Sequence, residues 1–182
     1  MAMPGMGDQR FEKSVIYLCA HSDEGAMGLI INQELDTPSV PDFLQQLEII
    51  SESENGELPG SVASKTLHVG GPVEPGRGFV LHSSEYQSES TLEIGADICL
   101  TATLEILRAI ATGKGPKNCL LALGYAGWAS GQLEDEISSN GWLTVDADTS
   151  IIFEVANDLK YDQSLKLLGV DANLLSPHAG HA

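Results

Sequence analysis

The strongest constraint on the fold of this 182-residue chain is a glycine-punctuated run, NCLLALGYAGWASGQLEDEI, at residues 118–137. The apolar stretch at residues 119–123 is typical of a buried strand, and it meets a glycine at Gly124. Two more glycines follow before a helical pattern opens at Gln132. The run predicts a strand, a tight turn and a helix, the arrangement that presents a nucleophile in hydrolases and holds a phosphate in nucleotide-binding proteins. The turn carries no Ser, Cys or Lys at its apex, so the architecture of a site is present without its usual chemistry.

Strands and helices interleave along the rest of the chain. Residues 14–19 and 26–32 are rich in β-branched and apolar side chains, and the five turn-forming residues between them predict a β-hairpin. Ser39 precedes an apolar helix face, and Asp42 three residues later resembles a capping box. Further strands are expected at residues 66–69, 78–82, 92–94 and 142–145, and further helices at residues 104–110, 132–139 and 161–168.

Several of these strands are joined by short turns, whereas others are separated by helices. The pattern predicts an α/β protein of the α+β type, in which helices pack on a mixed β-sheet. We expect residues 1–182 to form a single domain. Residues 51–61 are acidic and poor in apolar side chains and are expected to form a mobile loop, and residues 176–182 a loose tail.

The charge balance argues against one class of partner. The chain has 9 Lys and Arg against 26 Asp and Glu, a net charge of −17 at pH 7, and its basic residues are scattered. Because Lys and Arg contacts supply most non-specific DNA affinity, we expect no direct binding to nucleic acid. No apolar run approaches the roughly 20 residues that span a bilayer, and the first residues do not read as a signal peptide. We therefore expect a cytoplasmic protein without a membrane partner, whose three cysteines are reduced and buried.

Two glycine-rich segments, residues 70–77 and 124–128, are the candidate ligand-binding elements. In the first, the Arg77 guanidinium could hold a carboxylate or phosphate, and in the second, Trp128 would form an apolar wall. We expect the two segments to meet at one sheet edge and to take a small anion. The simpler alternative is that the glycines only permit tight turns and that Arg77 pairs with one of the 26 acids. The candidate ligand-binding residues are Asn32, Gly70, Gly71, Arg77, Gly127 and Trp128.

Two histidines, His68 and His82, fall in expected strands. If residues 65–70 and 78–82 pair as a hairpin, both imidazoles lie on one face of the sheet. Two imidazoles can begin a metal site, but no acid stands at a spacing that fixes a third ligand, so a structural pair is favoured. The sequence also lacks a G-x-S-x-G elbow and a CxxC pair. We expect no metal, no cofactor and no catalytic residue.

Short blocks of sequence, taken in order, resemble the YqgE/AlgH family. The blocks are MPGM at residues 3–6, SVIY at 14–17, GAMG at 25–28, GGPV at 70–73, RGF at 77–79, ALGYAGW at 122–128 and GQLE at 131–134. The resemblance implies a compact α/β domain whose mixed sheet curls toward a split pseudo-barrel. It implies no established activity, although one branch is named for a transcriptional regulator of alginate production.

The chain departs from the family pattern at two places. Members usually carry an apolar strand before the MPGM block, whereas this sequence begins almost at the block. We expect either that this strand is missing or that the start of the sequence is misplaced. Gln33 stands where a basic residue usually follows the asparagine, which weakens an anion-binding role for that position.

Together these features favour a non-catalytic binding or regulatory module that acts through a protein or small-anion partner. A role in transcription rests on the family name alone and would not involve direct DNA binding. The alternative is an enzyme that uses Arg77 with His68 or His82. The sequence leaves the ligand, the reaction and the oligomeric state open.

Overall fold

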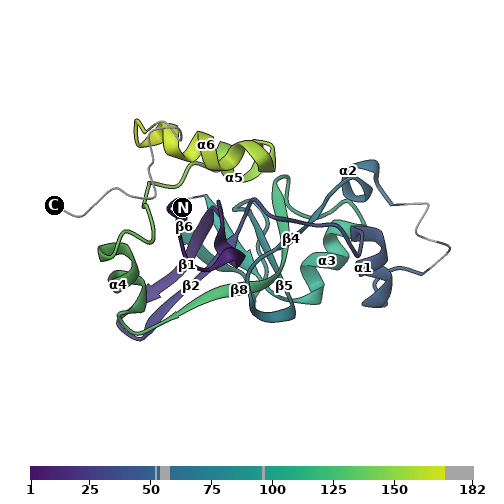
Figure 1. Cartoon of the computed structure of the whole chain (residues 1–182). Coiled ribbons are helices and arrows are strands. Elements are labelled where there is room, and N and C mark those ends of the chain that lie inside the picture. Colours follow the sequence, from purple (N-terminus) through teal and green to yellow (C-terminus); the bar gives the residue numbers. More distant parts are fainter. Residues whose placement is uncertain (52, 54–57, 96, 171–182) are drawn as a thin grey trace.

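The computed structural model of the chain describes residues 1–51, 53, 58–95 and 97–170 (Figure 1). The strands are β1 (Ile16–Ser22), β2 (Gly25–Ile30), β3 (Glu34–Leu35), β4 (Leu67–Val69), β5 (Val73–Ser83), β6 (Leu92–Gly95), β7 (Ile98–Thr101) and β8 (Cys119–Ala129). The helices are α1 (Val40–Gln46), α2 (Gly60–Ala63), α3 (Leu104–Ala111), α4 (Gln132–Ser138), α5 (Thr149–Phe153) and α6 (Asn157–Leu167). A short 3₁₀ helix, Gln9–Phe11, precedes β1.

One mixed sheet organises the molecule, in the order β1-β2-β8-β5-β7-β6, and β3 and β4 join it through the pairing of β4 with β8. The 11-residue strand β8 is its centre: the first half pairs with β5 and β4, and the second half pairs with β2. The pairing of β4 with β8 is parallel, and the other strand pairs are antiparallel. The expected mixed α/β fold is therefore confirmed.

The sheet curls until its first and last strands approach each other. The Tyr17 hydroxyl on β1 lies 2.9 Å from the position that a Cβ would take at Gly95 on β6, so the two strands are close neighbours in space. The irregular register of β5 against β8, between Val73 and Gly78, adds to the natural twist of the strands. The result is a nearly closed sheet, which confirms the expected curl toward a split pseudo-barrel.

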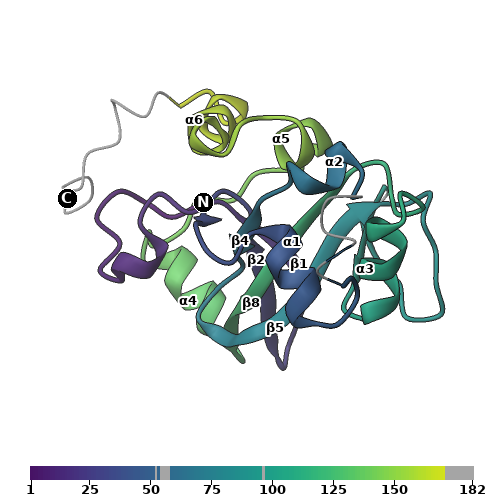
Figure 2. The same cartoon turned by 90° about the vertical axis from the view of Figure 1, so that its right-hand side faces the viewer.

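Helices cover the sheet in separate groups (Figures 1 and 2). Neighbouring residues of β5 point to opposite faces: Leu81 belongs to the cluster that includes Ile152 and Leu165 of α5 and α6. Val80 belongs to the cluster that includes Ile106 of α3, together with α1 and α2. Helix α4 packs on a third cluster at the far end of β8.

Several expected elements are confirmed. The β1–β2 hairpin pairs Ile16 with Ile30, although its turn is tighter than the expected five residues. The Ser39 Oγ caps α1 by accepting a hydrogen bond from the Asp42 backbone nitrogen over 3.2 Å. Helix α3 ends just before Gly113, which takes a φ of +71°.

Two expectations are wrong, and one strand was not predicted. The strand at residues 119–123 does not stop at Gly124, because that glycine adopts a φ of +72° and the strand continues to Ala129. Residues 142–145 form no strand, and only an isolated bridge joins Trp142 to Ala2. Strand β7 went unpredicted, because four buried residues between short turns give no periodic pattern.

The expected hairpin between residues 65–70 and 78–82 is also wrong. Ala122 of β8 pairs with His68 of β4 on one side and with Phe79 of β5 on the other. Strand β8 thus lies between the two strands that were expected to be partners. This pairing joins segments about 50 residues apart, which local patterns do not reveal.

The acidic segment at residues 51–61 lies partly outside the described residues, as does the whole tail at residues 176–182. The last part of the segment, from Gly60, begins helix α2. Within the described ranges, no helix is both long enough and apolar enough to cross a membrane.

Candidate functional site

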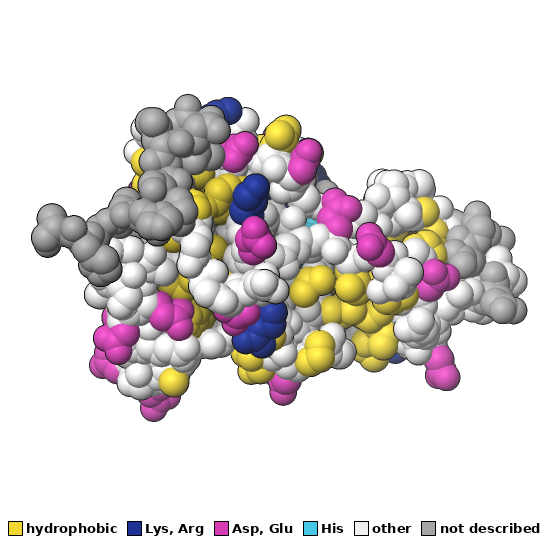
Figure 3. All heavy atoms as spheres, in the orientation of Figure 1, with side chains coloured by type: hydrophobic (Ala, Val, Ile, Leu, Met, Phe, Trp, Pro, Cys, Tyr) yellow, Lys and Arg dark blue, Asp and Glu magenta, His cyan; other side chains and the backbone are white. Residues whose placement is uncertain are grey.

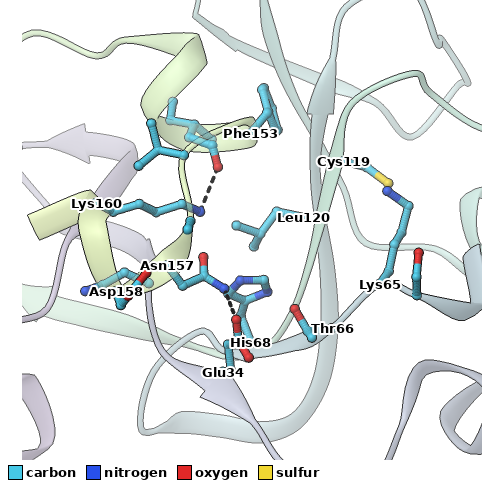
Figure 4. Close-up of a pocket in the computed structure, with 15 residues that line it drawn as sticks. Glu34, Lys65, Thr66, His68, Cys119, Leu120, Phe153, Asn157, Asp158 and Lys160 are labelled. Carbon is cyan, nitrogen blue, oxygen red and sulfur yellow. Dashed lines mark hydrogen bonds between the residues drawn. The ribbon is translucent and has the colours of Figure 1, made fainter. Parts of the chain in front are cut away.

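An open cleft of about 580 Å³ lies between the sheet and the helices α5 and α6 (Figure 4). Its walls come from distant parts of the chain: the end of β2, strands β3 and β4, the start of β8, and the turn between α5 and α6. The lining residues that carry chemistry are Asn32, Glu34, Lys65, Thr66, His68, Cys119, Asn157, Asp158 and Lys160. The nearly closed sheet and α6 together build a polar hollow that no single motif specifies.

Lys160 is the most unusual group in this cleft. It lies on α6 with only 3% of its surface exposed, and its Nζ donates to the main-chain oxygens of Ile31 and Ile152, both over 2.8 Å. Burial lowers the pKa of its ammonium group from 10.5 to about 8, although the nearby Glu34 carboxylate opposes the shift. A cation is thus held in the wall of the cleft by backbone oxygens.

His68 faces the same cleft from β4. Its Nδ1 lies 3.3 Å from the Leu121 carbonyl oxygen. Because a carbonyl can only accept, Nδ1 carries the proton, and Nε2 of the neutral ring is an acceptor. This Nε2 is buried and has no hydrogen-bond partner within the described residues. Desolvation lowers the pKa of His68, and the Lys160 charge adds to the shift, so the ring is neutral near pH 7.

Asn157 and Glu34 form the rim beside these two groups. The Asn157 Nδ2 donates to Glu34 Oε1 over 2.5 Å. Figure 4 shows the Asn157 amide beside the His68 ring, but its geometry provides no hydrogen bond to Nε2. The hydrogen bond between Asn157 and Glu34 holds both side chains at the entrance to the cleft, and the Nε2 atom of His68 is left without a donor.

The expected ligand-binding residues are distributed over different places. Asn32 lines the cleft, but its side chain is occupied: Oδ1 accepts from the Val15 backbone nitrogen over 2.7 Å, and Nδ2 donates to the Lys13 carbonyl over 2.9 Å. Its role in the structure is to hold β1 and β2 in register. Whether Asn32 also contacts a ligand stays a prediction.

The two glycine segments do meet, as expected. A Cβ at Gly70 would lie 2.2 Å from the Gly124 carbonyl oxygen, and a Cβ at Gly71 would lie 2.2 Å from the Tyr125 carbonyl carbon. The two backbones are therefore in direct contact and leave no room for a ligand between these glycines. Gly127 lies further along β8, opposite Met27 on β2.

Arg77 and Trp128 line different cavities. Arg77 forms an exposed ion pair with Glu74 over 2.9 Å, stacks on Phe79, and borders a small hollow beside α3. Trp128 borders an apolar cavity between β1 and α4. The expected convergence of these two side chains at one edge does not occur, and the ion pair corresponds to the simpler alternative for Arg77.

Trp128 instead takes part in a structural cluster. Its indole Nε1 donates to Glu136 Oε2 over 2.9 Å, and the Trp142 Nε1 donates to the same oxygen over 2.7 Å.

Glu136→Leu should therefore lower the free energy of unfolding by about 2 kcal/mol, because two indole N–H groups lose their acceptor. Glu136→Gln, which keeps an acceptor oxygen, should lose less. Urea unfolding followed by tryptophan emission measures both variants, and equal stabilities would contradict this account.

The two histidines are not a pair. His82 is fully buried on β5, where Nδ1 donates to the Ser83 carbonyl oxygen and Nε2 accepts from the Thr101 hydroxyl, each over 2.9 Å. Because β8 lies between their strands, the two imidazoles do not form the pair that was expected from a hairpin. Among the described residues, no three His, Cys, Asp or Glu side chains gather as a set of metal ligands.

The sequence contains one signal that could have identified Lys160. The buried positions of α6 are Lys160, Tyr161, Ser164 and Leu165, which follow the i, i+1, i+4, i+5 spacing of an inward helix face. Because Tyr161 and Leu165 are the large apolar side chains of that face, the same spacing predicts Lys160 as a buried lysine. Its position beside His68 depends on tertiary packing and carries no sequence signal.

The fold and the cleft define a single α/β domain with a nearly closed mixed sheet and a buried lysine at its polar hollow. The chain belongs to the AlgH-like family, whose sequence model matches residues 1–173. A UPF0301 protein of Bradyrhizobium diazoefficiens is 57% identical over the whole of this chain and 86% of its own length. A UPF0301 protein of a Methylobacterium species is 55% identical over the whole of this chain and 87% of its own length.

Solved structures agree with this assignment. The solution structure of the AlgH protein from Pseudomonas aeruginosa is similar with a TM-score of 0.79 and 41% identity, covering 100% of this chain and 93% of that chain. A crystal structure of a protein from Corynebacterium diphtheriae shares the fold, with a TM-score of 0.67 and 17% identity over 91% of this chain and 83% of that chain.

Proposed function

We propose that this protein is a binding module for a small anion, which occupies the cleft beside α5 and α6. The observation that carries the proposal is the buried, unpartnered Nε2 of His68 in a cleft that also contains a buried ammonium group. Buried polar atoms in folded proteins nearly always have a partner, so an acceptor without one favours a missing ligand. This cleft replaces the Arg77 loop as the preferred anion site.

The donors and acceptors of the cleft specify the kind of anion. Lys160 has three N–H groups when it is protonated, and two of them are used by the Ile31 and Ile152 carbonyls. The third is available for a ligand oxygen. The neutral His68 requires a hydrogen-bond donor at Nε2, so the ligand should both accept a hydrogen bond from Lys160 and donate one to His68. Monohydrogen phosphate and small hydroxy acids satisfy both conditions.

The surface charge favours a small ligand over a polyanion. Acidic side chains are spread over the face shown in Figure 3, and the Lys and Arg side chains on that face stand singly. A net charge of −17 repels an extended phosphate backbone, whereas a small anion in the cleft is close to Lys160 and partly shielded from that field. Glu34 at the rim is engaged by the Asn157 amide.

Titration with inorganic phosphate and with lactate, followed by calorimetry, tests the proposal. Acetate lacks the donor for His68 and should bind more weakly than lactate. Lys160→Met should weaken phosphate binding roughly tenfold or more, since a hydrogen bond to a charged group contributes about 1.5–3 kcal/mol. His68→Phe, which removes the acceptor and keeps a planar ring, should abolish the preference for lactate over acetate.

Two control variants complete the test. Lys166→Met removes an exposed lysine from the same helix and should leave binding unchanged. Arg77→Ala distinguishes the cleft from the loop: unchanged affinity supports the cleft, and a complete loss restores the Arg77 site. The proposal is wrong if phosphate and lactate do not bind at millimolar concentration, or if Lys160→Met and His68→Phe both bind like the unaltered chain.

A further inference from the structure

The amino group of Lys160 is held in an arrangement suited to covalent chemistry. A neutral amine has two N–H groups and one lone pair. The two N–H groups of Lys160 would both be used by the Ile31 and Ile152 carbonyls, which fixes the lone pair in the remaining tetrahedral direction. Figure 4 shows the Lys160 side chain extending along the wall of the cleft, with its nitrogen at the inner end.

The surroundings of this nitrogen shift its protonation equilibrium toward the neutral amine, compared with an exposed lysine. Among the described residues, Lys160 takes part in no ion pair, and its exposed fraction is 3%. A desolvated lysine without a paired carboxylate gains nucleophilic character, because the free amine is the reactive form. The lowered pKa of about 8 places a useful fraction of free amine near neutral pH.

We propose that Lys160 captures small oxo acids, by condensing with their aldehyde or ketone carbonyl to form an imine inside the cleft. This inference rests on the proposed anion site and narrows its ligand to a compound that carries a carbonyl beside a carboxylate. Thr66 lines the cleft beside His68 and would donate a hydrogen bond to the carboxylate, whereas the Lys65 ammonium lies against the Cys119 thiol (Figure 4).

The reaction balances without an oxidant or a reductant. The Lys160 lone pair attacks the carbonyl carbon, and the carbon–oxygen double bond becomes a single bond in a carbinolamine. The carbon–oxygen bond then breaks, and the oxygen leaves as water with the two hydrogens that the amine gives up. The Nε2 atom of His68, which has no hydrogen-bond partner, is the base in the same cleft that can accept a proton from the Lys160 nitrogen and return it to the departing hydroxyl.

The competing explanation is that Lys160 only ties α5 to β2 through the two carbonyls. The two explanations predict opposite orders of reactivity. A purely structural lysine with 3% exposure would be among the slowest to react in the chain. A lysine positioned for carbonyl capture would be the fastest, since a pKa of about 8 in place of 10.5 raises the free-amine fraction at pH 7 roughly 300-fold.

Reductive trapping decides between them. The full chain is incubated at pH 7 with glyoxylate and sodium cyanoborohydride, and peptide mapping by mass spectrometry locates the resulting carboxymethyl groups. Among the lysines, we expect a carboxymethyl group to form at Lys160 at least roughly tenfold faster than at the exposed Lys114, Lys117 and Lys166. Lys160→Arg should remove this rapid labelling, and His68→Phe should slow it while circular dichroism confirms that the fold is kept.

The outcomes separate this inference from the proposed function. If phosphate binds in the cleft but Lys160 is labelled no faster than the exposed lysines, carbonyl capture is wrong and the anion site stands. If Lys160 is labelled rapidly but neither phosphate nor lactate binds, the imine chemistry stands without the anion site. Slow labelling at Lys160 in the folded chain, with Lys160→Arg labelled identically, overturns the inference.

Discussion

Gly71→Ala is expected to lower the free energy of unfolding by at least about 3 kcal/mol, which corresponds to a fall of roughly 10 °C in the melting temperature. A Cβ at this position would lie 2.2 Å from the carbonyl carbon of Tyr125 and 2.3 Å from the backbone nitrogen of Ala126. These atoms belong to the central strand β8 and cannot move without disturbing its pairing with β2 and β5. Gly71 also has a φ of +154°, which adds strain for any other residue.

Gly76→Ala is the matched control in the same segment. Nothing lies within 4 Å of a Cβ built at Gly76, so alanine should be tolerated there. Both variants can be compared by thermal unfolding followed with circular dichroism. A Gly71→Ala protein that melts with the unaltered chain would show that the contact between the two glycine segments is looser than the structure indicates.

This contact illustrates what the sequence could predict about the site. The segments at residues 70–77 and 124–128 were expected to meet, and the backbones at Gly70, Gly71 and Gly124 are in contact. Their function was interpreted as ligand binding because glycine-rich turns expose backbone donors. In the structure, the backbone of β8 packs directly against the loop before β5. The glycines therefore allow close packing of two backbones and leave no space for a ligand between them.

Local patterns and long-range pairings differed in how well they could be predicted. The cap at Ser39 and the helix expected at residues 104–110 depend on neighbours within a few residues, and both are confirmed. The parallel pairing of β4 with β8 joins residues about 50 positions apart, and it was replaced in the prediction by a simpler hairpin. Because of that error, His68 was expected to lie beside His82. Its position in the same cleft as Lys160 could not be predicted, because the place of α6 over the cleft depends on how far the sheet curls.

The unfolding free energy of the unaltered chain should rise by about 3 kcal/mol relative to that of Lys160→Met between pH 8 and pH 10.5. In the folded chain the Lys160 pKa is about 8, whereas in the unfolded chain it is the ordinary 10.5. Between these values the unfolded chain keeps the proton that the folded chain has released, so stability increases with pH. Below pH 8 both states are protonated, and the full cost of burying the ammonium group is present.

The comparison isolates Lys160 from the other titrating groups. The buried Cys19 thiol and the tyrosines also titrate at high pH, but they are common to both proteins and cancel in the difference. Lys166→Met supplies the control for removing a lysine from an exposed position of α6, and its difference from the unaltered chain should stay flat. If Lys160→Met does not fold, Lys160→Arg serves in its place, because arginine remains charged throughout this range.

Urea unfolding at several pH values gives the required difference. A flat difference for Lys160→Met would mean that the ammonium group is as well solvated in the folded chain as in the unfolded chain. The amine would then hold no more free base near neutral pH than an exposed lysine, and rapid imine formation would lose its physical basis. A rise of the expected size would instead establish that the cleft holds a desolvated amine at the place where His68 leaves an acceptor unused, which is the chemical feature that most distinguishes this cleft from an ordinary surface hollow.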